Sequence, residues 1–374
     1  MAKSGLYIHI PFCARKCPYC DFYSVPLEWG TARQYVSAVI NQIQTADKSE
    51  VDTVYFGGGT PSLLNAKDIY LIIDAANEHF SLDRSSEITL EMNPATCSEA
   101  KLRDLRSAGI NRLSVGVQST DDAVLKKIGR LHNRAEALYT LELAHRCGFD
   151  NISADVMLAL PDESEKSLLC TINDLCSLPI THISAYLLKI MEGTPFSHSL
   201  PGYVPDDDRQ ADLYLMSCEL LDKLGFAQYE ISNFAKEPQF KSRHNLKYWN
   251  CEPYFGLGAA AHSSVGEKLF SFSRNIDKYL SVFCDSLKPE HGFCDYLDYE
   301  TSLEARDYIM LRLRTVDGLD LCELDRRFNF SFDRRKHELI DSFVREGFVL
   351  RSGSVISLTR RGMLVSNSVI SELI

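Results

Sequence analysis

The sequence contains no apolar run that approaches the roughly 18 to 20 residues of a membrane-spanning helix. It also has no excess of positive charge, because 40 Lys and Arg stand against 51 Asp and Glu and give a formal net charge of −11. An acidic chain is poorly suited to nucleic acid and to anionic membrane surfaces. No charged segment followed by an apolar segment opens the chain, so we expect no secretory signal and a cytoplasmic location.

Clustered cysteines are equally scarce. Twelve cysteines occur in 374 residues, and most of them are scattered without metal-binding spacing. Scattered thiols in a chain of this size indicate a reducing compartment rather than a disulfide framework. The exception is Cys13, Cys17 and Cys20, which form a C-x3-C-x2-C triplet directly after the apolar run Leu6–Pro11.

Three thiolates at this spacing suit a [4Fe–4S] cluster. Four irons and three protein ligands leave one iron open, and an open coordination position is how metal sites perform chemistry. Two alternatives remain, namely unrelated buried thiols and a zinc site that would need a fourth Cys or His nearby. His9 is the nearest such residue, but the alternation of side chains along a strand places it beside the loop rather than in it.

Strand-like and helix-like runs alternate through the first half of the chain. The predicted strands are Leu6–Ile10, Asp52–Phe56, Glu87–Glu91, Arg112–Val117, Asn151–Met157 and Thr181–Leu187. The predicted helices are Thr31–Thr45, Ala66–His79, Ser98–Ser107, Asp121–Ile128, Arg134–Arg146 and Ser164–Leu175. This alternation predicts a parallel sheet with right-handed crossovers. Six units fall short of the eight of a closed barrel, so we predict an α/β fold with an open, three-quarter (β/α)6 barrel.

Polar residues and glycines follow the predicted strands at the point where each one ends. The first strand leads into the cysteine triplet and the second into Gly57–Thr60, while the next three end at or contain Glu91, Gln118 and Asp155. Ligands of such sheets bind at the carboxyl ends of the strands. We therefore expect a polar ligand at this edge.

The pattern changes after residue 200. A long amphipathic helix is predicted at Asp206–Leu224, a strand at Gln228–Phe234, and an aromatic-rich, irregular segment at Phe240–Ser264. Helices at Leu303–Arg314, Leu321–Phe328 and Arg334–Gly347 and a hairpin at Phe348–Leu358 are typical of an α+β, winged-helix-like domain. DNA binding is disfavoured there, because 12 Lys and Arg accompany 11 Asp and Glu from residue 303 onward. We predict three domains, a partial barrel (1–200), a barrel extension carrying the aromatic segment (201–300) and the winged-helix-like domain (301–374).

Three motifs together resemble one protein family. They are Tyr7-x-His9-Ile10-Pro11-Phe12-Cys13, Gly57-Gly58-Gly59-Thr60-Pro61 and Gly116-Val117-Gln118-Ser119. The resemblance is to the radical S-adenosylmethionine (SAM) superfamily, in the branch of oxygen-independent coproporphyrinogen III dehydrogenase. It implies that the triplet binds a [4Fe–4S] cluster whose open iron takes the amino and carboxylate groups of SAM. The positions that it implies for SAM contacts are Tyr7, Tyr19, Gly58, Gly59, Thr60, Glu91, Gln118, Arg130 and Asp155.

Elementary chemistry is consistent with these SAM positions. Glycine has no Cβ and lets the backbone approach a ligand, a carboxylate accepts hydrogen bonds from hydroxyl or ammonium groups, and Arg130 can pair with a carboxylate. The alternatives are a simple turn at Gly57–Gly59 and a structural ion pair at Arg130 or Asp155.

Two departures separate the chain from the dehydrogenase. Phe22 stands where the dehydrogenase has a further cysteine, and only six residues precede Tyr7 where the dehydrogenase has an N-terminal arm. Phenylalanine at that position resembles instead the heme-chaperone subgroup, which also carries an H-N-x-x-Y-W element. Here that element is His244-Asn245-Leu246-Lys247-Tyr248-Trp249.

The subgroup resemblance implies that His244, Asn245, Tyr248 and Trp249 bind heme. An imidazole is a standard iron ligand, and aromatic rings pack on a porphyrin face. Arg243 and Lys247 would meet the heme propionates, and His262 is a second candidate for the iron ligand. Residue chemistry alone leaves another possibility open, a structural lid with the histidine of the element hydrogen-bonded inside.

The function implied is that of a cytoplasmic heme chaperone that holds a [4Fe–4S] cluster, SAM and heme and delivers heme to hemoproteins. An electron donor such as a flavodoxin or a ferredoxin would serve the cluster. The alternative is oxidative decarboxylation of coproporphyrinogen III, which Phe22 and the short N-terminus disfavour. A winged-helix regulator with a redox cluster is a third possibility, disfavoured by charge.

Overall fold

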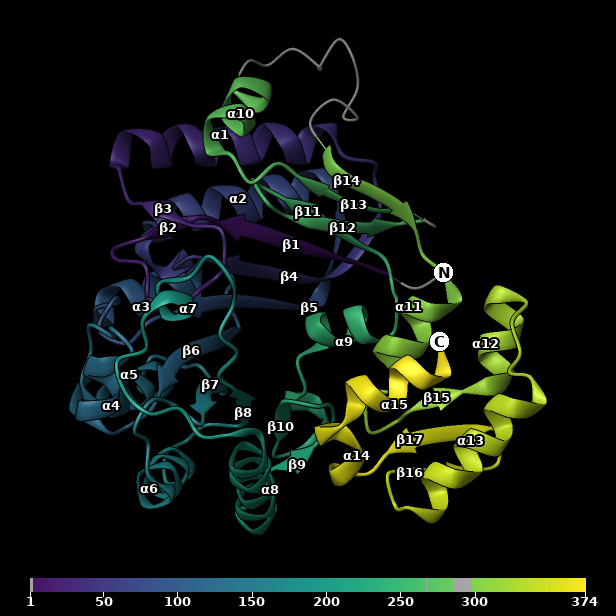
Figure 1. The fold of residues 1–374 in the computed structure, drawn as a ribbon. Coiled ribbons are helices and arrows are strands. Elements are labelled where there is room, and N and C mark those ends of the chain that lie inside the picture. The colour runs from purple at the N-terminus through teal and green to yellow at the C-terminus, as the bar shows by residue number, and fades with distance from the viewer. Residues whose placement is uncertain (1–2, 267, 285–296) are drawn as a thin grey trace.

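A large sheet with parallel strands at its centre organises the molecule (Figure 1). The structure is a computed structural model, which describes residues 3–266, 268–284 and 297–374; Cys294 lies outside this part of the chain. Six strands of the barrel are β1 Ser4–Ile10, β4 Glu50–Gly58, β5 Ser81–Met92, β6 Arg112–Gln118, β7 Asn151–Leu158 and β8 His182–Leu187. Each is parallel to its neighbour in the order β1-β4-β5-β6-β7-β8. The predicted strands are confirmed and are extended mostly by one to six residues.

The helices that connect these strands match the predicted segments. They are α1 Trp29–Thr45, α2 Ala66–His79, α3 Glu99–Ser107, α4 Asp122–Lys127, α5 Arg134–Arg146 and α6 Glu165–Cys176. Local signals explain the agreement. The Asn133 side chain accepts a hydrogen bond from the Glu136 amide in a capping box that begins α5. Gly109 ends the α3 turn with φ +110°, a conformation that glycine adopts without strain.

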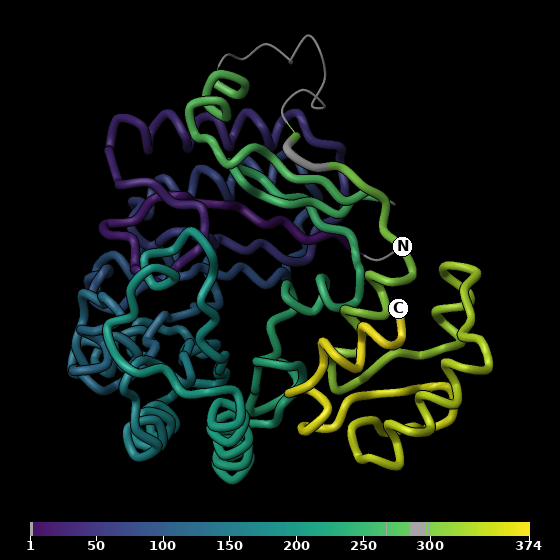
Figure 2. The backbone as a smooth tube through the Cα atoms, viewed as in Figure 1, coloured from purple at the N-terminus to yellow at the C-terminus, as the bar shows by residue number. Residues whose placement is uncertain are grey.

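The sheet is larger than the predicted barrel but does not close. Its order within the described residues is β14-β13-β12-β11-β1-β4-β5-β6-β7-β8-β10-β9. The additional strands are β9 Ala227–Gln228, β10 Asn233–Ala235, β11 Tyr254–Leu257, β12 His262–Val265, β13 Lys268–Phe272 and β14 Leu297–Ser302. Because β14 and β9 remain edges, the barrel is open, as predicted. Figure 2 shows β11 running beside β1, although about 250 residues separate them in the sequence.

Two predictions for this middle region are wrong. Gln228–Phe234 is not one strand, because β9 and β10 form an antiparallel pair. Phe240–Ser264 is not irregular, since it contains the helix α9 Arg243–Trp249 and the strands β11 and β12. The parallel pairing of β11 with β1 is a long-range contact that no local pattern reveals. The remaining elements of this half are α7 Pro195–His198, α8 Asp207–Lys223, α10 Ile276–Phe283, the short pair β2 Phe12–Cys13 and β3 Val25–Pro26, and the 3-10 turns Pro61–Leu63 and Pro238–Phe240.

The C-terminal region has a hydrophobic core of its own. Its elements are α11 Ala305–Arg312, β15 Leu319–Asp320, α12 Leu321–Phe328, α13 Arg334–Arg345, β16 Val349–Ser352, β17 Val355–Leu358, α14 Arg360–Leu364 and α15 Ser366–Leu373. The three strands form a separate antiparallel sheet in the order β15-β17-β16. Ile309, Leu324, Ile340 and Ile356 are fully buried in this second core. The α+β, winged-helix-like prediction agrees with this arrangement, whereas the boundaries at residues 200 and 300 stay predictions.

Candidate functional site

A cavity of about 370 Å³ lies inside the open barrel. Residues from all the parallel strands β4 to β8 line it, together with the loop that follows β2 and one residue of α9. The sequence-predicted residues among them are Cys13, Cys17, Tyr19, Cys20, Gly58, Gly59, Thr60, Glu91, Gln118, Arg130, Asp155 and Asn245. Residues that sequence reasoning did not single out also line it, namely Tyr55, Asn93, Arg112, Ser114, Ser184, Tyr186 and Asn233. Their only sequence signal is a position on, or just after, a predicted strand.

The Cys loop (residues 13–20) forms one wall at the carboxyl ends of the strands. It is fixed by backbone hydrogen bonds, because the Leu27 amide donates to the Cys13 carbonyl and the Cys20 amide donates to the Cys17 carbonyl, each at 3.1 Å. Burial, together with the neighbouring thiols, raises the pKa of the Cys20 thiol. In the described ranges no three Cys, His, Asp or Glu side chains converge on one point as single-metal ligands do. A [4Fe–4S] cluster requires no such convergence, because each thiolate binds a different iron. The donor set therefore fits the cluster.

The glycines after β4 bring backbone against the Cys loop. Gly58 has φ +115°, which only glycine adopts without strain, and its amide donates to Glu91 Oε2 at 3.0 Å. A Cβ on Gly59 would lie 2.7 Å from the carbonyl oxygen of Phe12. Thr60 Oγ1 accepts from Asn93 at 3.0 Å and lies 3.7 Å from Cys13 Sγ. These glycines are therefore required by the loop itself, and they leave a wall without side chains beside the thiols.

Two buried carboxylates lie at the middle of the cavity. Glu91 accepts a hydrogen bond from the Tyr55 hydroxyl at 2.8 Å, and burial raises the pKa of its carboxyl to about 7. Asp155 accepts from Ser114 at 3.0 Å, and burial raises its pKa as well. A buried carboxylate that is destabilised in this way gains from a ligand that donates hydrogen bonds or carries positive charge.

Gln118, the last residue of β6, and Arg130, in the turn between α4 and α5, both line the cavity. Arg130 donates to Asn93 Oδ1 at 2.5 Å, to the Gly116 carbonyl, and to Cys17 Sγ at 3.8 Å, while its Nε has no partner among the described residues. These partners are not carboxylates, so the guanidinium keeps its charge available for an anionic group. Gln118 has φ +70° and accepts from the Tyr186 hydroxyl at 3.1 Å.

Tyr7 differs from the other predicted SAM residues. Its hydroxyl shares a hydrogen bond with His9 Nδ1 at 3.0 Å, and its ring stacks on Tyr55 with centroids 6.2 Å apart. It packs behind the residues that line the cavity.

The helix α9, which carries the H-N-x-x-Y-W element, lies at the opposite end of the barrel from the Cys loop. Figure 1 shows it near the centre of the molecule, between the barrel and the C-terminal region. The Glu87 carboxylate on β5 accepts from the amides of Arg243 at 3.1 Å and His244 at 3.0 Å, which satisfies the first turn of the helix. The Ser242 side chain accepts from the Asn245 amide at 3.3 Å and adds a conventional cap.

His244 is fully buried, and both of its ring nitrogens are engaged. Nδ1 shares a hydrogen bond with the Thr53 hydroxyl at 2.8 Å, and Nε2 shares one with the Tyr248 hydroxyl at 2.7 Å. The ring also stacks on Tyr55 at 5.2 Å, and burial lowers the pKa of the imidazole to about 3. This is the lid-like arrangement that residue chemistry left open, and iron ligation would require one of the two hydrogen bonds to break, because an imidazole binds iron through a single nitrogen.

The other residues of the element differ in exposure. Asn245 lines the cavity, whereas Trp249 is half-buried on the outer part of α9. Lys247 is buried and pairs with Asp52 Oδ1 at 2.8 Å, and Arg243 pairs with Asp52 Oδ2 at 3.3 Å. Both cations predicted to meet propionates therefore have intramolecular partners in this arrangement.

His262, the second iron-ligand candidate, lies on the side of the Cys loop. It is exposed at the start of β12, and partial burial and the nearby Arg274 charge lower its pKa. Arg274 donates to the Asp21 carbonyl at 2.8 Å, directly before Phe22, whose side chain is 62% exposed.

Comparison with known proteins identifies the family of the chain. Two family models match, the radical SAM superfamily over residues 7–175 and the HemN C-terminal domain over residues 304–365. The heme chaperone HemW of Bacillus subtilis is 33% identical over 97% of this chain and 97% of its own. The heme chaperone HemW of Escherichia coli is 34% identical over 98% of this chain and 97% of its own. The chain belongs to the HemW family of radical SAM proteins.

A solved structure shows the same fold. Coproporphyrinogen III oxidase (HemN) from Escherichia coli, a radical SAM enzyme, superposes with a TM-score of 0.82 at 20% identity, over 99% of this chain and 89% of that one. The predicted family and fold are confirmed. At this identity the likeness shows the fold alone, because one fold serves many functions.

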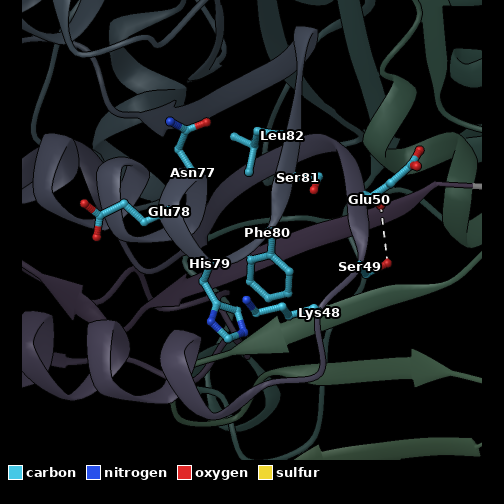
Figure 3. Close-up of a pocket in the computed structure, with 9 residues that line it drawn as sticks. All are labelled: Lys48, Ser49, Glu50, Asn77, Glu78, His79, Phe80, Ser81 and Leu82. Carbon is cyan, nitrogen blue, oxygen red and sulfur yellow. Dashed lines mark hydrogen bonds between the residues drawn. The ribbon is translucent and has the colours of Figure 1, made fainter.

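Another cavity lies on the outer surface of this HemW-family chain. It encloses about 540 Å³ at the amino ends of β4 and β5, and the residues labelled in Figure 3 line it, including Lys48, Glu50 and His79. None of the sequence-predicted site residues reaches it. Among the described helices, none has the length and apolar character that crossing a membrane requires.

Proposed function

We propose that this chain is a cytoplasmic heme chaperone that holds a [4Fe–4S] cluster and SAM in the barrel, binds heme and delivers it to hemoproteins. The observation that carries the first part is the single cavity that unites the three cysteines with the glycine wall and the buried carboxylates. The observation that supports the second part is nearly full-length similarity to proteins named as heme chaperones.

In this proposal Cys13, Cys17 and Cys20 bind the cluster. SAM lies against Gly58, Gly59 and Thr60, with Glu91 and Asp155 accepting hydrogen bonds from it and Arg130 facing its anionic end; Tyr19 and Gln118 complete the contacts. When bound, the cluster and SAM supply one-electron chemistry, for which a flavodoxin or a ferredoxin is the proposed electron donor. The protein contributes burial, since the carboxylates lie where water is largely excluded.

The heme site stays a proposal with two possible iron ligands. His244 requires release from Thr53 or from Tyr248 before it can bind iron, whereas His262 is already exposed. Trp249, Tyr248 and Asn245 are the residues of the element proposed to pack on the macrocycle or bind its edge.

The test uses the full-length protein after anaerobic reconstitution with iron and sulfide. Heme is titrated into it, and the loaded protein is mixed with a heme-free acceptor hemoprotein whose absorbance reports transfer. We expect stoichiometric binding and a transfer rate above that of free heme. Transfer no faster than from free heme would contradict the chaperone proposal.

A parallel reaction with coproporphyrinogen III, SAM and reductant tests the alternative enzyme. We expect no decarboxylated porphyrinogen, because Phe22 replaces the dehydrogenase cysteine at the mouth of the cavity. Formation of that product would show that the protein has the dehydrogenase activity.

A further inference from the structure

The inner end of the barrel cavity contains the buried guanidinium of Arg112, whose charge acts on Glu91 and Asp155 and lowers their pKa values against the effect of burial. Arg112 is the first residue of β6, its side chain is 1% exposed, and it lines the cavity. Its Nε has no hydrogen-bond partner in the described part of the chain. Buried arginine is normally paired with an anion, since an unpartnered buried donor destabilises the folded state.

Neighbouring strands repeat this pattern of unpartnered polar groups. Thr89 on β5 pairs in register with Arg112, and its buried hydroxyl also has no partner among the described residues. Asn233 on β10 lines the same cavity; its Oδ1, a hydrogen-bond acceptor, has no partner among the described residues, while its side chain also hydrogen-bonds Glu230. These groups come from strands far apart in the sequence, so the sheet brings them together at one place.

SAM does not account for this inner end. Gln118 and Arg112 stand at opposite ends of β6, and at about 3.3 Å per residue their Cα atoms are roughly 20 Å apart. A SAM carboxylate at the Cys loop is therefore far from Arg112. Ser184, Ser232 and Asn245 of α9 also line the cavity, and Ser184 hydrogen-bonds Asp155.

We propose that Arg112 and Asn245 form a binding site for the carboxylate of a second small molecule inside the barrel. Arg112 donates to the carboxylate oxygens, and the side-chain amide of Asn245 completes the shell. In this proposal the H-N-x-x-Y-W element has a positioning role. His244 is held by Thr53 and Tyr248, and this fixes α9 so that Asn245 faces the cavity.

The carboxylate has two possible sources, a heme propionate or a free small carboxylate. The first rests on the proposed function, whereas the second does not. The probes are heme, heme dimethyl ester, which lacks the propionate charges, and glutarate. Each is tested with the full-length wild type, with Arg112→Gln and Asn245→Ala, and with Arg134→Gln as a matched control at an exposed arginine paired with Asp174.

If a propionate occupies the site, the wild type and the control bind heme about 10- to 100-fold more tightly than the ester. Arg112→Gln and Asn245→Ala lose that preference while still binding the ester. If a free carboxylate occupies it, heme and ester bind equally, and glutarate raises the melting temperature of the wild type and the control but not of the two variants.

Equal affinities for heme and ester together with no glutarate effect in the wild type would overturn the proposal. Circular dichroism establishes which variants fold, and Asn245→Ala keeps the test decisive if Arg112→Gln does not. Heme transfer is measured on the same samples, so that failure of the inner carboxylate site can be told apart from failure of the chaperone proposal. Normal heme transfer without carboxylate binding would contradict only the inner site.

Discussion

The Cys loop and α9 close opposite ends of one cavity, and they differ in how their polar groups are satisfied. At the Cys loop the backbone is fixed, yet the thiols and the Nε of Arg130 remain without strong partners. At α9 the helix amides, both nitrogens of His244 and the Lys247 ammonium are all paired within the chain. The Cys loop therefore leaves groups free for a ligand, whereas the H-N-x-x-Y-W element of α9 forms contacts within the chain that hold the helix in place.

The sharpest way to test the Cys loop is to replace Cys13, Cys17 and Cys20 together with Ala. We expect complete loss of the cluster, because no other cysteines in the described residues share the cavity. The fold should persist, since backbone hydrogen bonds hold the loop. Iron content and visible absorbance after reconstitution measure the first effect, and circular dichroism the second. Undiminished cluster content would remove the Cys loop as the metal site.

Substitution at Gly59 tests the wall beside the thiols. Even Gly59→Ala places a Cβ 2.7 Å from the Phe12 carbonyl oxygen, so we expect the SAM-induced change in the EPR signal of the reduced cluster to disappear. The matched control is Gly30→Ala in α1, where a Cβ meets nothing within 4 Å and helix propensity gains about 1 kcal/mol. If Gly59→Ala gives the same EPR change as the wild type, these glycines serve only the turn and have no role in SAM binding.

His244→Ala sharpens the comparison from the α9 side. We expect a loss of about 3 kcal/mol in the free energy of unfolding, because a buried ring is removed and the Thr53 and Tyr248 hydroxyls lose their partner. Chemical denaturation measures it, with His145→Ala, at an exposed histidine, as control.

The heme spectrum of the same variant decides its second role. Shifted bands in folded His244→Ala, with unchanged bands in His262→Ala, would support His244 as the iron ligand. The reverse result would assign the iron to His262 beside the Cys loop, and Trp249→Ala then reports the aromatic contact through affinity alone.

The smallest effect concerns the pH dependence of Glu91. Its folded pKa of about 7 lies above the unfolded value of 4.5, so between these values the folded state holds a proton that the unfolded state lacks. Stability from this group is therefore present at low pH and is lost as pH rises, by about 1.4 kcal/mol per pH unit within the window. Glu91→Gln should flatten that slope in denaturation measured from pH 5 to pH 7. An unchanged slope would show that Glu91 is ionised throughout.

Local patterns were sufficient for the parallel strands of the barrel, for the helices that connect them and for the Cys loop. Ala66–His79 and Arg134–Arg146 have the predicted bounds, since capping and apolar periodicity act within a few residues. The spacing of the three cysteines and the placement of Glu91, Gln118 and Asp155 at strand ends follow from the chain order of an α/β unit. The family resemblance rests on these same local motifs.

Only the tertiary structure decided where α9 lies and what Arg112 faces. The carboxylate that satisfies the first turn of α9 is Glu87, more than 150 residues earlier, and the only local signal for a helix in the segment described as irregular is the Ser242 cap. Arg112 looks like an ordinary strand residue until β5 brings the unpartnered hydroxyl of Thr89 beside it. The sequence by itself determined the strands and helices of the barrel and the spacing of the Cys loop, because these depend on short-range geometry. Sheet closure and burial, which depend on strand register, decided which polar groups are paired and which await a ligand.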